Sequence, residues 1–423
     1  MKIKVHRGTK EIGGTCLEIT ASNGTVLWID LGAPLDTKNP DISYAKGKVD
    51  ALLISHPHQD HYGLMRMVGD EIPIYIGGVG LYLINAVPMF VEEVEPYNLN
   101  FRVFKAWEEF TILETFKIKP YLTDHSTPEA FSFLIEVDGQ RIFYSGDYRA
   151  TGRKGQLFDK FVSAPPKNID VLFTEGTMVK RENHKFQSEQ DIEEELVSIL
   201  ESQNNTSFLL SSAQNIDRMV SCYNACKRTE KFLVVDAYTA WLMEQVSKVS
   251  SAIPVIERNE VRVYISKSQR ASLIRNGQLD FLKKLEQHQV GNKVFNNPEN
   301  YLYFTRCPNE QFLGEIRSKG TINIIYSQWQ GYLQKEYEQW FTEAVNKLKL
   351  ESQKNDSNIK FHFVHTSGHA VVEDLVKYVK AVNAKKVVPI HTAYPTEFKR
   401  LLDEQGIQGT ELWDDNVLHS FES

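Results

Sequence analysis

Cysteine is scarce in this chain, which has four in 423 residues: Cys16, Cys222, Cys226 and Cys307. None of them forms a Cys-x-x-Cys pair, the spacing of thiolate zinc sites and redox motifs. A disulfide framework is also excluded, because such frameworks are dense in cysteine and belong to small secreted chains. We therefore interpret each cysteine as a small buried hydrophobic residue, and we expect a reducing, cytoplasmic compartment.

Long apolar runs are missing as well. No segment reaches the roughly 18 apolar residues of a membrane-spanning helix. The N-terminal MKIKVHRGTKEIGG has no apolar region of the kind that secretory signals carry. We expect neither a membrane partner nor a secretory signal. The chain also has no internal repeat, and its length predicts two domains.

The chain also lacks an overall excess of positive charge. The formal net charge is −7, which argues against a nucleic-acid partner. The charge is uneven, however, because residues 205–350 contain 19 Lys and Arg against 14 Asp and Glu, a net charge of +5. A basic middle in an acidic chain weakly favours a polyanion-binding module. An excess of solvated lysines explains it equally well.

The pattern of apolar residues divides the chain into three parts. Residues 1–204 contain short apolar and β-branched runs separated by Gly, Asn and Pro, which predict strands with some helices between them. Residues 205–350 alternate continuous apolar runs with helical patterns, which predicts a parallel, doubly wound sheet. Residues 351–423 are too few for a core of their own. We expect them to complete the first domain, which makes the middle part an insertion.

Four metal-binding side chains crowd into HPHQDH, residues 56–61, after a run that predicts a buried strand. In an extended backbone His56 and His58 point to the same side and can share one metal. Asp60 and His61 begin the following helix and face a second position. Imidazole nitrogen and carboxylate oxygen together suit zinc, iron or manganese. A histidine-rich surface loop is the alternative.

Three further candidate ligands follow other predicted strands: His125 in YLTDHST, Asp147 in IFYSGDYR and His391 in VVPIHTA. Gly146 allows the backbone a close approach beside Asp147. Each residue alone is more often structural or solvated. As a set of ligand types that all end strands, they predict the remainder of a metal site.

These residues resemble, in order and context, the ligands of the metallo-β-lactamase superfamily. The resemblance covers Met1 to about Met178 and about Ile359 to the end. It implies an α/β fold, an αββα sandwich with two divalent metal ions between the sheet ends, zinc being expected and manganese the alternative. His56, His58 and His125 would hold one ion, and Asp60, His61 and His391 the other, with Asp147 bridging. Asp30 in LWIDLG matches an aspartate that is usually structural in that fold.

Two further residues narrow the resemblance. Glu175 in LFTEGT, a long insertion, His369 in HTSGHA and then His391 follow the order of the β-CASP nucleases, whose cap domain is an inserted α/β unit. SSAQNIDRM, residues 211–219, is similar to the segment that opens this cap's helix. The whole is similar to the ribonuclease J branch. Because the chain stops near residue 423, we expect the separate C-terminal domain of long ribonuclease J proteins to be absent.

The resemblance implies a metal-dependent ribonuclease that cleaves phosphodiester bonds in single-stranded RNA. Asp60 would orient the nucleophile, and His369, made more basic by Glu175, would protonate the leaving oxygen. Ser367 and Gly368 would present a hydroxyl and an amide to a phosphate, unless they only form a helix N-cap turn. His365, four residues before His369, is a further candidate for substrate binding.

Aromatic residues of the middle part are candidates to stack on unpaired bases, although their spacing also suits core positions. They are Tyr301, Tyr303, Trp329 and Tyr332. Two other functions stay open: a hydrolase of the same fold that acts on DNA or a small phosphodiester, and a non-catalytic RNA-binding scaffold. Metal content separates the scaffold from the hydrolases, and substrate preference separates the hydrolases from each other. A homodimer also stays open.

Overall fold

The computed structural model describes residues 1–35, 41–181, 185–202, 205–291, 296–308, 310–334 and 339–421. It forms two compact units. Unit 1 comprises Met1–Ile84, Tyr97–Asn183 and Gly368–Ser423, and unit 2 comprises Asn85–Pro96 and His184–Ser367. Within these described residues no helix has the length and apolar character that a membrane crossing requires.

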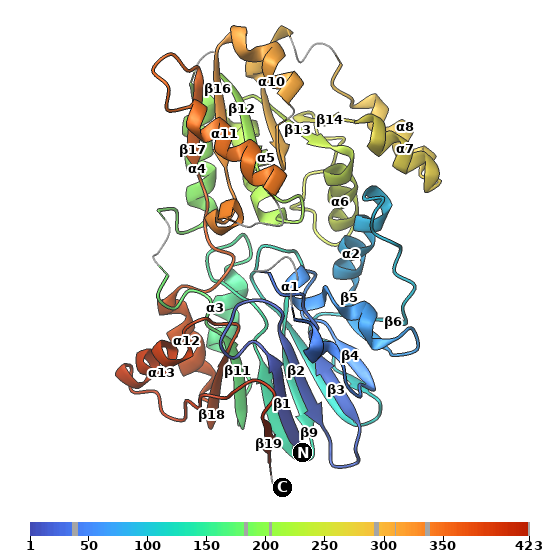
Figure 1. The fold of residues 1–423 in the computed structure, drawn as a ribbon, viewed down its shortest axis with the longest axis vertical. Helices are drawn as coiled ribbons and strands as arrows, with labels where there is room; N and C mark the ends of the chain where they lie inside the picture. Colours follow the sequence, from blue (N-terminus) through green and yellow to red (C-terminus); the bar gives the residue numbers. More distant parts are fainter. Residues whose placement is uncertain are drawn as a thin grey trace. The chain divides into compact units, whose positions relative to one another are not determined.

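Unit 1 contains two sheets that face each other across a shared core. In sheet order the first consists of β19 (Leu418–Ser420), β1 (Lys2–Arg7), β2 (Cys16–Thr20), β3 (Val26–Ile29), β4 (Ala51–Leu53), β5 (Ile74–Gly77) and β6 (Phe101–Phe104). The second consists of β18 (Lys386–Ile390), β11 (Val171–Glu175), β10 (Gln140–Tyr144), β9 (Phe131–Val137), β8 (Phe116–Leu122) and β7 (Phe110–Ile112). Side chains on the inner faces, such as Ile19, Leu27 and Phe133, form one buried cluster. The two ends of the chain lie side by side, because β1 pairs antiparallel with β19 (Figure 1).

Helices cover both outer faces of this sandwich. The second sheet is covered by α3 (Gln156–Ser163), α12 (Val372–Val382) and α13 (Pro395–Glu404). The first is covered by η1 (Ser43–Ala45), α1 (Gln59–Tyr62), η2 (Met65–Val68) and the start of α2 (Gly78–Phe90). Figure 1 shows α12 and α13 beside β11 and β18. The α-β-β-α layering confirms the predicted sandwich.

The direction of the strands determines where polar residues gather. β3 runs parallel to β4 in the first sheet, and β10, β11 and β18 are parallel in the second. β8 shares their direction, because it and β10 both pair antiparallel with β9. Parallel strands end at the same edge of a sheet, so the residues that follow them are brought together there.

Unit 2 is built on a six-stranded sheet in which every neighbouring pair is parallel. Its order is β14 (Val261–Tyr264), β13 (Phe232–Asp236), β15 (Tyr301–Thr305), β12 (Asn205–Leu210), β16 (Thr321–Tyr326) and β17 (Ile359–Phe363). The predicted parallel sheet of the middle region is therefore confirmed. α10 (Glu310–Ile316) and α11 (Gln339–Glu351) pack on one face, where Phe341 and Leu348 meet Phe208 and Ile324. Among the described residues, unit 2 also contains α4 (Glu189–Glu201), α5 (Ile216–Arg228), α6 (Ala237–Ser247), α7 (Lys267–Arg275) and α8 (Leu279–Gln287), with short turns η3 (Pro298–Asn300), η4 (Arg317–Lys319) and η5 (Gln330–Gln334).

The limits of unit 2 differ from the expected domain limits of 205 and 350. β17 pairs with β16 and extends unit 2 to Ser367. The polar segment 352–358 is thus a loop within unit 2, between α11 and β17. The sequence pattern of a strand does not show which sheet the strand will join. β17 joins the sheet of unit 2, on which the preceding helix α11 packs. Asn85–Pro96, which begins inside α2, also belongs to unit 2.

A buried ion pair joins the elements of unit 2. Arg218 on α5 donates from Nε and Nη2 to the two carboxylate oxygens of Glu189 on α4, at 3.1 and 3.0 Å, and neither side chain is more than 1% exposed. Its Nη1 donates to the backbone oxygen of Ser327, directly after β16, at 2.9 Å. One guanidinium therefore connects two helices to the end of a central strand.

We expect Glu189→Gln to loosen this part of unit 2. The substitution leaves the Arg218 guanidinium buried without its counter-charge, and removing one partner of a buried ion pair costs about 3–5 kcal/mol. Amide hydrogen exchange, followed by mass spectrometry of peptides from α4, α5 and β16, measures the loss as faster exchange.

Glu194→Gln is the matched control on the same helix. Glu194 pairs with Arg228 at 2.7 Å, but both side chains are about half exposed, and exposed pairs contribute little to stability. Equal acceleration of exchange in the two variants would contradict the assigned role of the buried pair.

Candidate metal centre

The seven candidate ligands converge at the strand-end edge of unit 1. His56 and His58 follow β4, and Asp60 and His61 lie in α1. The other three follow β8, β10 and β18; they are His125, Asp147 and His391. All of them except His58 and Asp60 are at most 2% exposed. The structure thus brings together residues that are up to 335 positions apart in the chain.

Three histidines form the first group of donors. His58 Nδ1 lies 3.1 Å from His56 Nε2 and 3.1 Å from His125 Nε2. Tetrahedral zinc with Zn–N bonds of 2.0–2.1 Å separates its nitrogen ligands by about 3.3 Å. Burial lowers the pKa of all three imidazoles, that of His58 to about 4. Neutral rings with converging nitrogens fit one divalent metal ion.

Asp60, His61 and His391 form the second group. His391 Nε2 lies 3.2 Å from Asp60 Oδ2. Burial disfavours a charged His61, yet the carboxylates of Asp147, Asp30 and Asp60 outweigh burial and raise its pKa. A group of donors that attracts a proton so strongly also attracts a metal cation.

Asp147 stands between the two groups. Its Oδ2 lies 3.7 Å from His56 Nε2 in the first group and 3.2 Å from His61 Nε2 in the second. Its Oδ1 lies 3.7 Å from His391 Nδ1. This position is the one that a bridging carboxylate requires, and together the donor atoms fit divalent metal binding.

Asp30 orients the histidines from behind. Its buried carboxylate accepts hydrogen bonds from Ser55 N at 2.7 Å, Ser55 Oγ at 2.7 Å, Tyr144 OH at 2.6 Å and His61 Nδ1 at 2.8 Å. Because His61 uses Nδ1 for Asp30, its Nε2 faces Asp147. Asp30 was predicted to have a structural role. In this geometry, that role is to determine which ring nitrogen of His61 faces the metal position.

Other residues orient the remaining rings, and sequence reasoning missed them. Thr177 Oγ1 lies 2.9 Å from His391 Nδ1, and Lys154 Nζ donates to the backbone oxygen of His125 at 2.8 Å. Ser55 and Tyr144, which hold Asp30, belong with them. Ser55 directly precedes HPHQDH, and that adjacency was the only sign of its role in the sequence.

Two glycines allow the backbones of the centre to approach. A Cβ at Gly32 would lie 1.6 Å from the carbonyl oxygen of Asp60. Gly146 has φ of +55°, and a Cβ there would lie 2.6 Å from the carbonyl oxygen of Phe131. Asp30 and His391 also adopt positive φ, +57° and +48°, which is strained for residues other than glycine.

Glu175 and His369 lie beside the second group. His369 Nδ1 is 3.0 Å from Glu175 Oε2 and 3.6 Å from Asp147 Oδ2. The Glu175 carboxylate is buried and also accepts from the backbone N–H groups of Tyr148 and Thr177, at 3.1 and 3.4 Å. Burial lowers the pKa of His369, but the charges of Glu175 and Asp147 outweigh it and raise that pKa overall.

The three candidates for substrate binding divide between the units. Gly368 belongs to unit 1 and accepts a 2.6 Å hydrogen bond from His125 Nδ1 through its carbonyl oxygen. His365 and Ser367 belong to unit 2, where His365 is half-buried and Ser367 is 8% exposed. The structure brings only Gly368 into contact with a metal-ligand candidate within its own unit.

Comparison with known protein families and proteins finds two family models and several relatives. Residues 28–210 match the β-lactamase superfamily domain, and residues 357–410 match the RNA specificity domain of zinc-dependent metallo-hydrolases. The chain is 23% identical to ribonuclease J of Mycoplasma genitalium, covering 87% of this chain and 62% of that protein. It is 23% identical to ribonuclease J of Mycoplasma pneumoniae, covering 97% and 71%. The chain thus spans about two thirds of the length of these relatives.

Two more comparisons cover part of the chain or its fold. An RNase J-like protein of Methanocaldococcus jannaschii is 31% identical over 191 residues, which are 41% of this chain and 42% of that protein. A solved structure of a protein of unknown function from Enterococcus faecalis superposes with a TM-score of 0.76 at 19% identity, covering 99% of each chain. The latter shows a shared fold.

We expect His58→Ala and Asp30→Asn to weaken metal binding to different degrees. His58→Ala removes a nitrogen that faces both other rings of its group, so the ion of that group should be lost. Asp30→Asn leaves all donors in place but removes the charge that orients His61, and such substitutions typically weaken affinity about 10–100-fold. Metal content per chain by mass spectrometry, and competition with a chelator, measure the two effects.

His288→Ala is the control, because His288 ends α8 in unit 2 and belongs to neither group of donors. Circular dichroism reports whether each variant keeps its fold. A His58→Ala chain with the metal content of the His288→Ala chain would refute the first group as a metal site.

Proposed function

We propose that the chain, whose residues 28–210 match the β-lactamase superfamily domain, is a ribonuclease that cleaves phosphodiester bonds of single-stranded RNA at a centre of two divalent metal ions. One observation carries the proposal. The Glu175–His369 pair adjoins the second group of donors, with His369 3.6 Å from Asp147. A general acid beside a metal site is what the cleavage of a poor leaving group needs.

The donors support two ions, and we propose zinc, with manganese as the alternative. When bound, such ions supply Lewis acidity that neutralises charge on a phosphate and makes water nucleophilic at neutral pH. Asp60 would then orient the attacking water and accept its proton. Its position supports this role: it lies in the first turn of α1, its side chain is 13% exposed, and one of its oxygens lies 3.2 Å from His391.

His369 would protonate the departing oxygen of the RNA. Its Nδ1 faces Glu175, so the ring presents Nε2 away from the carboxylate, and its side chain is 22% exposed, against 1% for Glu175. The buried carboxylate keeps the ring in the orientation and protonation state that a donor needs. Glu175 therefore acts as a positioning residue and His369 as the acid.

The choice of RNA rests on the relatives and on the second family model. That model is named for RNA specificity and spans both His369 and His391. Gly368 positions His125 through its carbonyl oxygen, and we propose that Ser367, the Gly368 amide and His365 contact phosphate or ribose from the adjoining turn. We further propose a cytoplasmic location, which fits four cysteines without disulfides.

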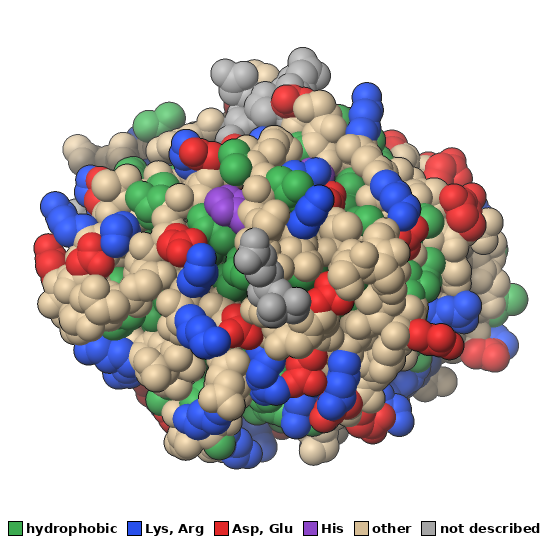
Figure 2. Space-filling model, turned by 90° about the horizontal axis from the view of Figure 1, so that it is seen from below, with side chains coloured by type: hydrophobic (Ala, Val, Ile, Leu, Met, Phe, Trp, Pro, Cys, Tyr) green, Lys and Arg blue, Asp and Glu red, His purple; other side chains and the backbone are tan. Residues whose placement is uncertain are grey.

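The charged side chains on the surface support attraction of RNA by a few local groups rather than by the surface as a whole. On the face of the molecule in Figure 2, Lys and Arg side chains alternate with Asp and Glu. Such a face offers no surface of one sign to a nucleic acid. We therefore propose that phosphate contacts come from the metal centre and from small groups of cations.

We expect cleavage of RNA and little cleavage of DNA. The test uses end-labelled single strands of one sequence in both chemistries, each with a 5′-monophosphate, in zinc or manganese. Asp60→Ala should lose cleavage, because it removes both a metal ligand and the group that orients water. Product lengths show whether cutting is internal or begins at the 5′ end.

Each other outcome identifies a different function. Equal cleavage of DNA would favour a general phosphodiesterase of the same fold. Bound metal without cleavage of either polymer would refute the proposal and favour a hydrolase of a small phosphodiester. A chain that binds RNA but no metal would favour a scaffold.

His369→Ala should lower kcat on RNA by about 10²–10⁴-fold, the usual contribution of a general acid. Hydrolysis of bis(p-nitrophenyl) phosphate should change far less, because p-nitrophenolate departs without a proton. The two rates, measured on the same preparation with its metal content, separate loss of the acid from loss of the centre.

Glu175→Gln serves as the comparison, since it keeps the shape of the pair and removes its charge. It should reduce RNA cleavage less than His369→Ala does. Full activity of His369→Ala on RNA would show that another group protonates the leaving oxygen.

A further inference from the structure

Trp340 on α11 is 60% exposed, an unusual degree for the largest side chain. The aromatic residues expected to stack on bases are only partly exposed, and they pack against neighbouring rings. Tyr303 stacks on Phe208 with centroids 4.8 Å apart, and Trp329 packs edge to face with Tyr332 at 5.5 Å. Trp340, which sequence reasoning did not single out, keeps most of its indole surface open.

A guanidinium lies beside this indole. Arg306, directly after β15, has its guanidinium carbon 5.7 Å from the Trp340 ring and 5.5 Å from the Phe341 ring. A cation at this distance is attracted to the ring and limits the orientations of both side chains. The pair thus combines an open aromatic surface with a positive charge, at the carboxyl end of a strand in a parallel sheet, where such sheets bind ligands.

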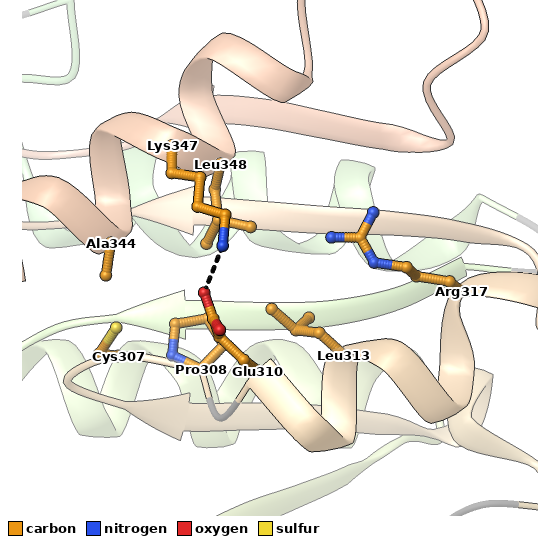
Figure 3. Close-up of a pocket in the computed structure, with 8 residues that line it drawn as sticks. All are labelled: Cys307, Pro308, Glu310, Leu313, Arg317, Ala344, Lys347 and Leu348. Carbon is orange, nitrogen blue, oxygen red and sulfur yellow. Dashed lines mark hydrogen bonds and ion pairs between the residues drawn. The ribbon is translucent and has the colours of Figure 1, made fainter.

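A pocket is lined by residues that follow Arg306 in the chain and by α11, the helix that carries Trp340 (Figure 3). Cys307 and Pro308, which follow Arg306, form one wall, and Ala344 and Lys347 of α11 form another. Residues 340, 344 and 347 are spaced by four and three positions, so they share one face of the helix. We call Trp340, Arg306, Arg317, Lys347 and the pocket between them the Trp340 groove.

Cations dominate the polar atoms of the Trp340 groove. Figure 3 shows Lys347 and Arg317 directed into the pocket, with Lys347 paired to Glu310. Arg317 pairs with Glu351. The Lys347–Glu310 pair is largely exposed and therefore weak. The Arg317–Glu351 pair is less exposed and joins two guanidinium nitrogens to the two carboxylate oxygens. A phosphate can therefore compete for the Lys347 ammonium group, and it can share the five N–H donors of Arg317 with Glu351.

The size of the pocket decides against an enclosed small molecule. Its volume is about 130 Å³, whereas small-molecule sites usually measure about 300–1,000 Å³. Trp and Arg are also common at protein interfaces, but Lys and Glu are depleted there, and this groove contains Lys347 and Glu310. An open aromatic ring followed by a shallow cationic pocket suits an extended chain that alternates rings and phosphates.

We infer that the Trp340 groove binds single-stranded RNA, with a base stacked on Trp340 and a neighbouring phosphate at Lys347 and Arg317. The choice of RNA rests on the proposed function. The groove lies wholly in unit 2 and contains none of the catalytic or metal-ligand candidates. It adds affinity for the RNA strand outside the bonds that are cut.

The test compares RNA affinity of the full chain with and without Trp340. Fluorescence anisotropy with a labelled, non-cleavable 2′-O-methyl decamer reports the Kd. Trp340→Ala should raise the Kd by about 5- to 100-fold, the usual effect of removing one base–aromatic stack. Trp340→Phe should retain most of the affinity, because a smaller ring still stacks.

Trp107→Ala is the matched control, since Trp107 is 44% exposed in unit 1 and lies in no groove described above. It should leave the Kd unchanged. All variants should hydrolyse bis(p-nitrophenyl) phosphate at the wild-type rate, which reports the metal centre separately. Equal Kd values for Trp340→Ala and Trp107→Ala would overturn the inference while leaving the proposed function intact.

Two further outcomes also test whether the Trp340 groove binds RNA. If the wild-type chain binds no RNA but hydrolyses the small phosphodiester, both the RNA substrate and the groove are refuted. If Trp340→Ala alters the mass of the particle by light scattering and leaves the Kd unchanged, the face is a contact between protein chains and the inference is wrong.

Cys307 provides an independent measurement. It is the half-buried cysteine of the pocket, whereas Cys16, Cys222 and Cys226 are buried. A maleimide should therefore label Cys307 first, and the decamer should slow this labelling several-fold in the wild type but not in Trp340→Ala. A labelling rate that RNA does not change would overturn the inference.

Discussion

The carboxylate of Asp30 is buried between the two sheets of unit 1, and the arrangement of the metal ligands depends on it. It follows β3 of one sheet and accepts a hydrogen bond from Tyr144 at the end of β10 in the other. A buried charge is tolerated only when its hydrogen bonds are complete, and here Ser55 and His61 complete them. One anion thus joins the sheets at the edge where the ligands stand.

The rigidity of the centre follows from the hydrogen bonds of the Asp30 carboxylate. Strand ends carry the donors, and strands in a packed sandwich move little, so the donor atoms are held before any ion arrives. The positive φ angles of Asp30 and His391 are unfavourable in isolation, and the surrounding hydrogen bonds maintain them. His369 is held in a similar way. Backbone amides hold the carboxylate of Glu175, and this carboxylate fixes the ring of His369. A preorganised site needs little rearrangement during a reaction.

The sequence predicted which candidate ligands come together better than it predicted the residues around them. His56, Asp147 and His391 each stand within three residues after an apolar run, so residue type and strand end coincide in a short pattern. Tyr144 and Thr177 act through contacts with residues 114 and 214 positions away, which no local pattern records. The sequence did not predict that unit 2 extends to Ser367, for a similar reason. The pattern of β17 predicts a strand, but packing decides which strand it pairs with. Trp340 lies within a helical pattern that does not show how far its ring is exposed, and only the structure shows that it is open.

The acidic charge of the chain and an RNA substrate are compatible because electrostatic attraction is local. Charges farther apart than about 10 Å are largely screened at physiological salt, so the net charge of −7 matters less than the groups near each phosphate. At the centre the imidazoles are neutral ligands, and Asp60 and Asp147 carry two negative charges that two divalent ions would exceed. At the Trp340 groove, stacking contributes without any net charge. RNA binding by this chain should therefore depend more on bound metal and on one exposed ring than on the number of its lysines.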